Sequence, residues 1–251
     1  MKKLFALLLA LVMMMSLVAC GENPDGTTTN PTNPANPTNP TNPTNPTNPS
    51  EPTNPEGKVP ASAVALLNEM FANVPEDIRY VVDVETGDYY LDENGEKMAV
   101  FNGGSFLFDE EGIPYYPGVN AAGAIDMTTE GALFTLFVGE EHYANVEEAA
   151  SLFHGQNGNT FTSGALKLKE GTDMAALAKS VRDAIAGNFW MCGIPDRFVV
   201  ASVGNYLVIV YGHDGVGDEN YKTTQVVTPF VKDLATMYPN AEILFDEMIG
   251  G

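Results

Sequence analysis

Residues 198–211 read FVVASVGNYLVIVY, and this stretch decides the fold of the C-terminal half of the chain. Two apolar runs, 198–203 and 206–211, flank the dipeptide Gly204-Asn205. Aromatic and β-branched residues favour strands, and a Gly-Asn pair between two such runs is typical of a tight hairpin turn. The stretch therefore predicts two antiparallel strands joined by a short turn.

The hairpin has a helix and a strand on each side. Upstream, 165–168 is predicted to be a strand and 173–186 a helix with one apolar face. Downstream, 223–238 is predicted to be a helix and 242–245 a last strand. This order is that of a split βαβ arrangement. The sequence thus predicts an α+β fold with a ferredoxin-like βαββαβ unit over 159–251.

The preceding part, 61–158, is predicted to be a smaller unit of helix and antiparallel strands. Apolar residues recur at helical spacing over 63–71, after Ser62 as a plausible N-cap. Gly87-Asp88 and Asn94-Gly95 are typical turn dipeptides. Further elements are expected over short stretches: strands at 78–84, 89–91, 98–101 and 133–138, and a helix at 146–153.

The two parts share a faint internal similarity. Between Pro75 and Tyr89 the chain has, with gaps, the order Pro, Asp, Arg, aromatic, Val, Val, Gly, Asp, Tyr, and a closely similar order runs from Pro195 to Tyr206. Either the parts are degenerate copies of one unit, or the same helix, proline and hairpin pattern arose twice.

A family resemblance covers about fifty residues, 165–214. It rests on LKLK at 166–169, the helix that begins at Asp173, GIPD at 193–196 and GNYLVIV at 204–210. This stretch resembles the carboxy-terminal domain of unknown function found in lipoproteins of low-GC Gram-positive bacteria. The resemblance implies a location and a fold, and it implies no activity.

The first nineteen residues have the three-part layout of a secretory signal. Lys2 and Lys3 precede an apolar run over 4–19, which is shorter than the ~20 residues that a membrane-spanning helix needs. Cys20 follows directly. Residues 17–20, LVAC, resemble the bacterial lipobox, which implies removal of 1–19 and acylation of Cys20. An ordinary cleavage site beside a coincidental cysteine is the alternative.

Residues 20–60 are predicted to be the lipid anchor and a tether. Asn-Pro-Thr repeats fill 30–49, and proline can supply neither helix interior nor sheet. The tract also lacks the apolar residues that a core needs. In polyproline II geometry, at about 3.1 Å per residue, the tether reaches at most ~120 Å.

The charge of the chain is strongly negative and unevenly distributed. Twelve Lys and Arg against 33 Asp and Glu give a net charge of −21. Phosphate binding needs a basic surface, so no nucleic acid partner is expected. Residues 61–150 hold 18 acids against two bases, Arg79 and Lys97, whereas 151–251 hold 11 acids against seven bases. Such a surface either keeps the protein soluble or attracts a basic partner.

No catalytic residue, cofactor or metal site is predicted. Cys192 lies among apolar residues, where core packing is expected, and none of the three histidines stands in a recognisable nucleophile signature. Acid clusters at 92–96, 109–112 and 217–220 lack the ligand spacing of a calcium loop and are expected to be solvated turns. Paired carboxylates of a glycoside hydrolase stay possible, because that geometry leaves little trace in a sequence.

Seven aromatic residues fall between residues 89 and 116. Aromatic faces on a sheet bind sugars or peptides, or else form the core side of that sheet. In the doublets Tyr89-Tyr90 and Tyr115-Tyr116, adjacent strand residues face opposite ways, so one of each pair should be exposed. Tyr90 and Tyr116 are the candidate ligand face.

The sequence therefore predicts a membrane-anchored extracytoplasmic lipoprotein. Its partners are the lipid bilayer, through acylated Cys20, and an unknown envelope ligand or protein that a non-enzymatic module binds. Two alternatives stay open: a hydrolase of envelope glycan or peptide that uses carboxylates, and a structural accessory of a membrane complex. A pocket with two carboxylates would favour the hydrolase, and an exposed aromatic patch would favour binding.

Overall fold

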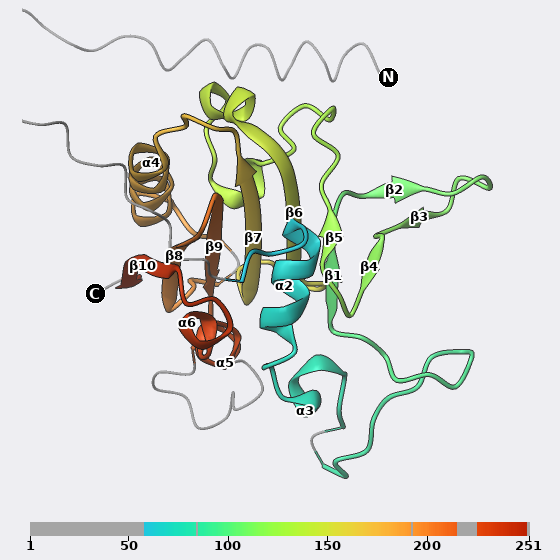
Figure 1. Cartoon of the computed structure of the whole chain (residues 1–251). Coiled ribbons are helices and arrows are strands. Elements are labelled where there is room, and N and C mark those ends of the chain that lie inside the picture. The colour runs from blue at the N-terminus through green and yellow to red at the C-terminus, as the bar shows by residue number, and fades with distance from the viewer. Residues whose placement is uncertain (1–57, 84, 192, 215–224, 250–251) are drawn as a thin grey trace, which may run out of the picture. The chain divides into compact units, whose positions relative to one another are not determined.

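The computed structural model describes residues 58–83, 85–191, 193–214 and 225–249, all within the compact unit Glu51–Gly251. An eight-stranded antiparallel sheet has the order β10-β8-β9-β7-β6-β1-β4, with β5 paired to β6 (Figure 1). The predicted α+β class is confirmed. The expected signal and the tether up to residue 57, Cys20 included, lie outside the described residues, as do Cys192 and the acid cluster at 217–220.

The C-terminal part contains the predicted order of strands and helices. Its elements are β7 (Phe161–Leu168), α4 (Met174–Ala186), β8 (Arg197–Val203), β9 (Tyr206–Gly212), α5 (Val227–Val231), α6 (Leu234–Met237) and β10 (Ala241–Met248). The helix expected over 223–238 is two short helices, because Asp233 leaves helical backbone angles and its carbonyl starts the second one.

The ferredoxin-like detail is not confirmed. A ferredoxin-like unit places its last strand beside its first, whereas β10 lies beside β8 and β7 lies beside β9 and β6. The connection β7-α4-β8 and the connection β9-α5-α6-β10 each join two parallel strands and run towards the β10 edge of the sheet. Their starting strands, β7 and β9, point in opposite directions. Since crossovers between parallel strands are right-handed, the two connections must cross opposite faces of the sheet.

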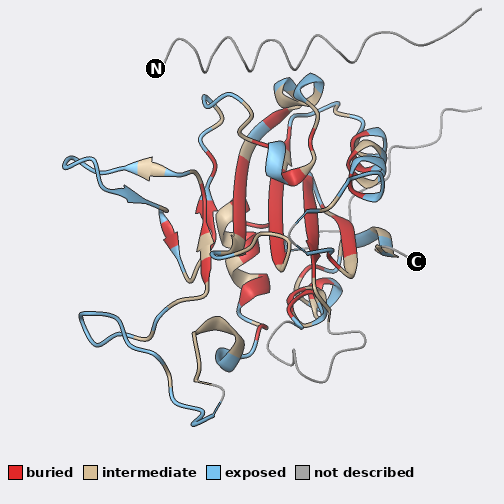
Figure 2. Ribbon diagram, turned by 180° about the vertical axis from the view of Figure 1, so that it is seen from behind, coloured by how far each residue is buried: buried red, intermediate tan, exposed pale blue. Residues whose placement is uncertain are grey.

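Helices do cover both faces, which makes three layers (Figure 2). On one face, Leu177 and Val181 of α4 belong to the same apolar cluster as Val200 and Ile209. On the other face, α2 (Ala63–Phe71) and α5 pack in a cluster with Val199, Val208 and Val210. Burial on both faces explains why the central strands are continuously apolar.

The N-terminal part adds strands to the same sheet. Its α2 begins at the predicted N-cap, Ser62, whose side chain accepts a hydrogen bond from the Ala65 amide at 3.0 Å. The other elements are α3 (Glu76–Arg79), β1 (Phe101–Gly103), β2 (Leu107–Phe108), β3 (Pro114–Tyr115), β4 (Gly118–Val119), β5 (Gly123–Ala124), η1 (Phe134–Leu136), η2 (Glu140–Asn145) and β6 (Val146–His154). Because β6 pairs with β7, strands on both sides of residue 158 share one sheet.

Two predicted elements of this part are wrong. The expected helix at 146–153 is strand β6, since Ala149 packs in the cluster under α4 and Ala150 in the cluster under α2. Its glutamates and alanines favour a helix locally, but pairing with β7 overrides that preference. The expected strand at 133–138 contains a 3₁₀ turn instead, η1, in which Leu136 is buried, as is the N-cap residue Leu133 three positions before it.

The segment 78–84 is not the continuous strand expected from its pattern. It begins in α3 and continues as isolated bridges, Tyr80 with Ala99 and Val82 with Tyr89. Arg79 ends a helix, whereas its counterpart in the internal similarity, Arg197, opens β8. The two similar stretches thus fold differently.

Candidate interaction surface

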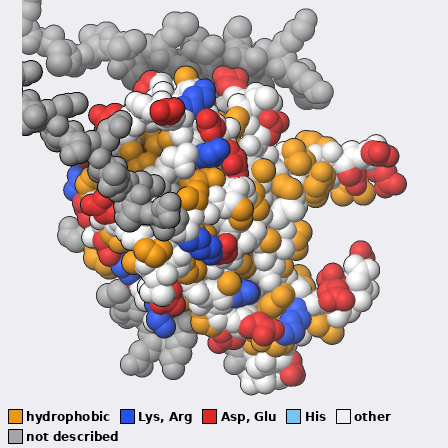
Figure 3. All heavy atoms as spheres, in the orientation of Figure 1, with side chains coloured by type: hydrophobic (Ala, Val, Ile, Leu, Met, Phe, Trp, Pro, Cys, Tyr) orange, Lys and Arg blue, Asp and Glu red, His pale blue; other side chains and the backbone are white. Residues whose placement is uncertain are grey.

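Two hairpin arms project from the sheet on the side of β1 (Figure 1). The first arm, residues 80–99, has three extended segments joined by isolated bridges, and the bridge between Leu91 and Lys97 closes its outer hairpin, 89–97. The second arm, residues 105–117, contains the β2-β3 pair, in which Phe108 faces Pro114. Side chains of the second arm are largely apolar, with acids at its tip (Figure 3).

The tips of the two arms have the same turn. In the first arm, the Asp92 carboxylate accepts hydrogen bonds from the amides of Asn94 and Glu96, both at 2.9 Å. The Asp92 carbonyl accepts from Gly95, which has φ +81°.

In the second arm, the Asp109 carboxylate accepts from the amides of Glu111 at 2.9 Å and Ile113 at 2.8 Å. Its carbonyl accepts from Gly112, with φ +80°. The acid clusters at 92–96 and 109–112 are therefore turns, as predicted. An offset of 17 residues superimposes YYLDENG at 89–95 on FLFDEEG at 106–112.

The second arm has aromatic rings that pack on one another and, through Tyr116, on the sheet. Phe106 is 51% exposed and Phe108 is 64% exposed. The Phe106 ring lies 5.2 Å from the Phe108 ring and 5.3 Å from the Tyr116 ring. Tyr116 in turn lies 5.0 Å from Phe153 of β6. Despite these contacts, Phe106 and Phe108 keep half or more of their surface exposed, so the second arm has an exposed aromatic patch that is a candidate interaction surface.

The base of the second arm is fixed by close backbone packing. A Cβ on Gly103 would lie 2.4 Å from the Gly123 nitrogen and 2.5 Å from the Ser151 carbonyl oxygen. The Gly104 amide donates to the Ser151 hydroxyl at 3.1 Å, and the Ser105 amide donates to the Ala124 carbonyl at 3.1 Å. At Gly103 and Gly123, β1, β5 and β6 thus lie too close together for a side chain, and two hydrogen bonds hold the start of the arm on the sheet.

The structure places the two predicted ligand residues differently. Tyr90 is the outward member of its doublet, 48% exposed, and its hydroxyl donates to the Asp83 carboxylate at 3.0 Å. That hydrogen bond raises the pKa of Tyr90. Tyr116 is partly buried, and Tyr115 is the exposed member of the second doublet. The two candidates lie on different arms, and no contact joins them.

Phe106 and Phe108 are the residues that sequence reasoning did not single out. They belong to the seven aromatics and alternate in a short run expected to be extended, where residues two apart share a face, but the two tyrosine doublets supplied the predicted ligand residues. The similarity of YYLDENG at 89–95 to FLFDEEG at 106–112 is the sequence pattern that could have pointed to Phe106 and Phe108.

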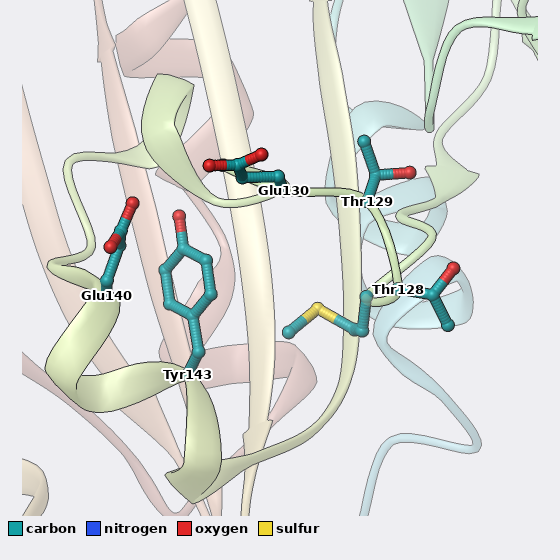
Figure 4. Close-up of a pocket in the computed structure, with 7 residues that line it drawn as sticks. Thr128, Thr129, Glu130, Glu140 and Tyr143 are labelled. Carbon is teal, nitrogen blue, oxygen red and sulfur yellow. The ribbon is translucent and has the colours of Figure 1, made fainter.

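A separate pocket of about 310 Å³ lies beside η1 and η2 (Figure 4). Two carboxylates, Glu130 and Glu140, line it together with Tyr143, whose hydroxyl accepts a hydrogen bond from the Leu133 amide at 3.2 Å. The remaining lining residues are Met127, Thr128, Thr129 and Gly131. Neither a histidine nor a lysine lines the pocket, so Glu130 and Glu140 are its candidate acid and base groups.

Arg197 forms the densest charged cluster, at one end of β8. Its guanidinium donates to Asp246 at 2.7 and 2.8 Å, to Asp214 at 2.8 Å and to the Thr228 hydroxyl at 2.8 Å. These protein acceptors occupy most of its donors. The cluster therefore ties β8, β10 and α5 together and offers little to a ligand.

The comparisons with known proteins give no relative. No protein-family model matches the chain, and neither a curated protein nor a solved structure is significantly similar to it. None of the helices in the described ranges has the length and apolar character needed to cross a membrane. In the same ranges, no three His, Cys, Asp or Glu side chains gather as metal ligands would.

Proposed function

We propose that this protein is a lipid-anchored, extracytoplasmic binding module whose second arm contacts an envelope ligand or partner protein. One observation carries the proposal: Phe106 and Phe108 belong to neither apolar cluster and are exposed to solvent, on an arm whose base packs closely on the sheet. Rings held outside the core stabilise the fold little, whereas a rigid aromatic surface suits recognition.

Cell-based crosslinking tests the binding surface. A photo-crosslinking amino acid in place of Phe108 in the full-length protein should give a discrete crosslinked product. The matched control is the same amino acid in place of Phe134, which is 79% exposed on η1, away from the arm. Products of equal yield from both positions, or none from position 108, would remove the second arm as the binding surface.

The membrane anchor rests on the lipobox resemblance of residues 17–20. Two or more acyl chains at about 0.8 kcal/mol per buried CH₂ hold a protein stably on a bilayer. Cys20→Ala should abolish labelling by a metabolic fatty-acid probe and leave an uncleaved or mislocalised precursor. Labelling that persists in Cys20→Ala would refute the anchor.

The hydrolase alternative has one observation in its favour, the pair Glu130 and Glu140 in one pocket. Acid and base roles need two carboxylates on opposite sides of a bound substrate. Release of soluble fragments from purified cell wall by the wild type, lost in both Glu130→Gln and Glu140→Gln, would replace the binding function with an enzymatic one.

A further inference from the structure

We infer that the second arm binds a lysine or arginine side chain of a partner protein, with the cation against the exposed part of the Phe106 ring. This inference rests on the proposed function and specifies the chemistry of its partner. Its basis is the first arm, where the same hairpin already holds an ammonium group that belongs to the chain itself.

In the first arm, Lys97 occupies an aromatic site. Its Nζ lies 3.8 Å from the centre of the Tyr89 ring and 5.2 Å from the centre of the Tyr80 ring. The two rings meet edge to face, 5.9 Å apart. The Glu76 carboxylate accepts a hydrogen bond from the ammonium at 2.5 Å. A cation within about 6 Å of a ring centre is attracted by the ring quadrupole.

The second arm has the corresponding ring without the cation. At the 17-residue offset, Tyr89 corresponds to Phe106, and the bridge of Leu91 with Lys97 corresponds to the pair of Phe108 with Pro114. Proline therefore stands where the first arm has its lysine. Among the residues that the structure describes, no lysine or arginine lies over Phe106, Phe108 or Tyr116.

The surrounding sequence cannot easily supply that cation. No lysine or arginine occurs between Lys97 and Lys167, whereas this stretch holds nine acids. Two of them, Glu110 and Glu111, stand at the tip of the second arm and form no ion pair with a described residue. Their charge complements a basic segment, and the exposed rings of Phe106 and Phe108 complement its aliphatic stem.

Peptide binding tests this inference. The full-length protein in phosphatidylcholine nanodiscs is titrated into a fluorescent peptide of alternating lysine and alanine, with empty nanodiscs as the blank. We expect binding that weakens with added salt and that falls roughly tenfold when the peptide lysines are acetylated. Phe106→Leu combined with Phe108→Leu should weaken binding by a similar factor, and Phe106→Tyr should retain it.

Phe134→Leu is the matched control, because it removes an exposed ring outside the arm. Thermal melting of each variant checks that it is folded. Equal binding of the two peptides, with both weakened by the arm variants, would overturn the cation inference and leave the arm as an apolar binding surface.

Peptide binding that ignores the arm variants, or no peptide binding at all, would also overturn the inference, and the crosslinking experiment would then decide the proposed function separately. Vesicle binding of the Cys20→Ala protein that is lost when Phe106→Leu and Phe108→Leu are added would identify lipid as the occupant instead, because the apolar segment 4–19 is the same in both proteins.

Discussion

The two hairpin arms share a turn and differ in what covers their rings. In the first arm, Lys97 lies over Tyr89 and pairs with Glu76. In the second arm, Pro114 takes the corresponding position and Phe106 stays open. The first arm therefore covers part of its aromatic surface with a cation of its own chain, whereas the aromatic surface of the second arm is exposed.

The attachment of the arms also differs. The first arm has isolated bridges between its own segments and ends just before β1, whereas the second arm follows β1 through a glycine-packed junction with β5 and β6. A rigid base orders the arm before binding, which lowers the entropic cost of association. We therefore expect substitutions at the base of the second arm to be more damaging than substitutions elsewhere in the arms.

The largest effect is expected at this junction. In Gly123→Ala, the new Cβ would lie 2.4 Å from the Gly103 carbonyl oxygen and 2.8 Å from the Gly104 nitrogen, both backbone atoms that cannot rotate away. We expect a loss of about 3 kcal/mol or more in the free energy of unfolding, measured by urea titration.

Gly112→Ala at the tip is the control for that variant. Its Cβ would meet nothing within 4 Å, and only the φ of +80° is unfavourable. The expected loss is about 1 to 2 kcal/mol. If Gly123→Ala cost no more than Gly112→Ala, the rigid base would be disproved.

A smaller effect separates the two tyrosines. Tyr116→Ala removes edge contacts with Phe106 and Phe153 and should cost about 2 kcal/mol. Tyr90→Ala removes an exposed side chain and should leave the melting temperature unchanged within error. Equal destabilisation by both variants would show that the first arm is packed as tightly as the second.

Lys97→Met tests whether the two aromatic sites are equivalent. Removing the ammonium should open the Tyr89 face, so that the lysine and alanine peptide binds two sites per chain, counted by calorimetry, where the wild type binds one. Lys179→Met, at an exposed position on α4, is the matched control. An unchanged single site in Lys97→Met would contradict the equivalence of the arms.

The smallest effect concerns pH at the base of the second arm. His154 faces Phe101 of β1 in the sheet, and its Nδ1 accepts hydrogen bonds from the amides of Gln156 and Asn157, both at 3.3 Å. Burial, and then repulsion from His213, lower the pKa of His154 below its ordinary value.

Because this pKa is lower in the folded state, the unfolded state takes up the proton first as the pH falls below about 6.5. Stability should be full above that pH and should decline towards the folded-state pKa. His154→Gln should lose this part of the pH dependence in urea titrations. The same slope in His154→Gln and the wild type would assign the dependence to other groups.

Local patterns predicted the elements with strong short-range signals. The hairpin at 198–211, the helix that begins after Asp173, the N-cap at Ser62 and the acidic turns all follow from residues within a few positions of one another. The failure at 146–153 has the opposite cause, because Ala149 and Ala150 are strand residues only where β7 and two apolar clusters surround them.

The candidate surface was predicted only in part. The density of aromatic residues between 89 and 116 pointed to the right region, and Tyr90 is exposed as expected. In the second doublet, Tyr115 is exposed and Tyr116 is partly buried, because Tyr116 packs against Phe153, a residue 37 positions away. Exposure is a property of such distant contacts, and a linear pattern records only alternation.

By itself, the sequence determined the α+β class, the order of elements in the C-terminal part and the acidity of the arms, since these depend on local preference and on charge. The tertiary structure alone decided the strand order, the faces that the helices cover and the cation held by one arm. The physical reason is that one element order fits several strand orders. Pairing energy selects among them over long separations, and the handedness of crossovers then fixes the faces that the helices cover.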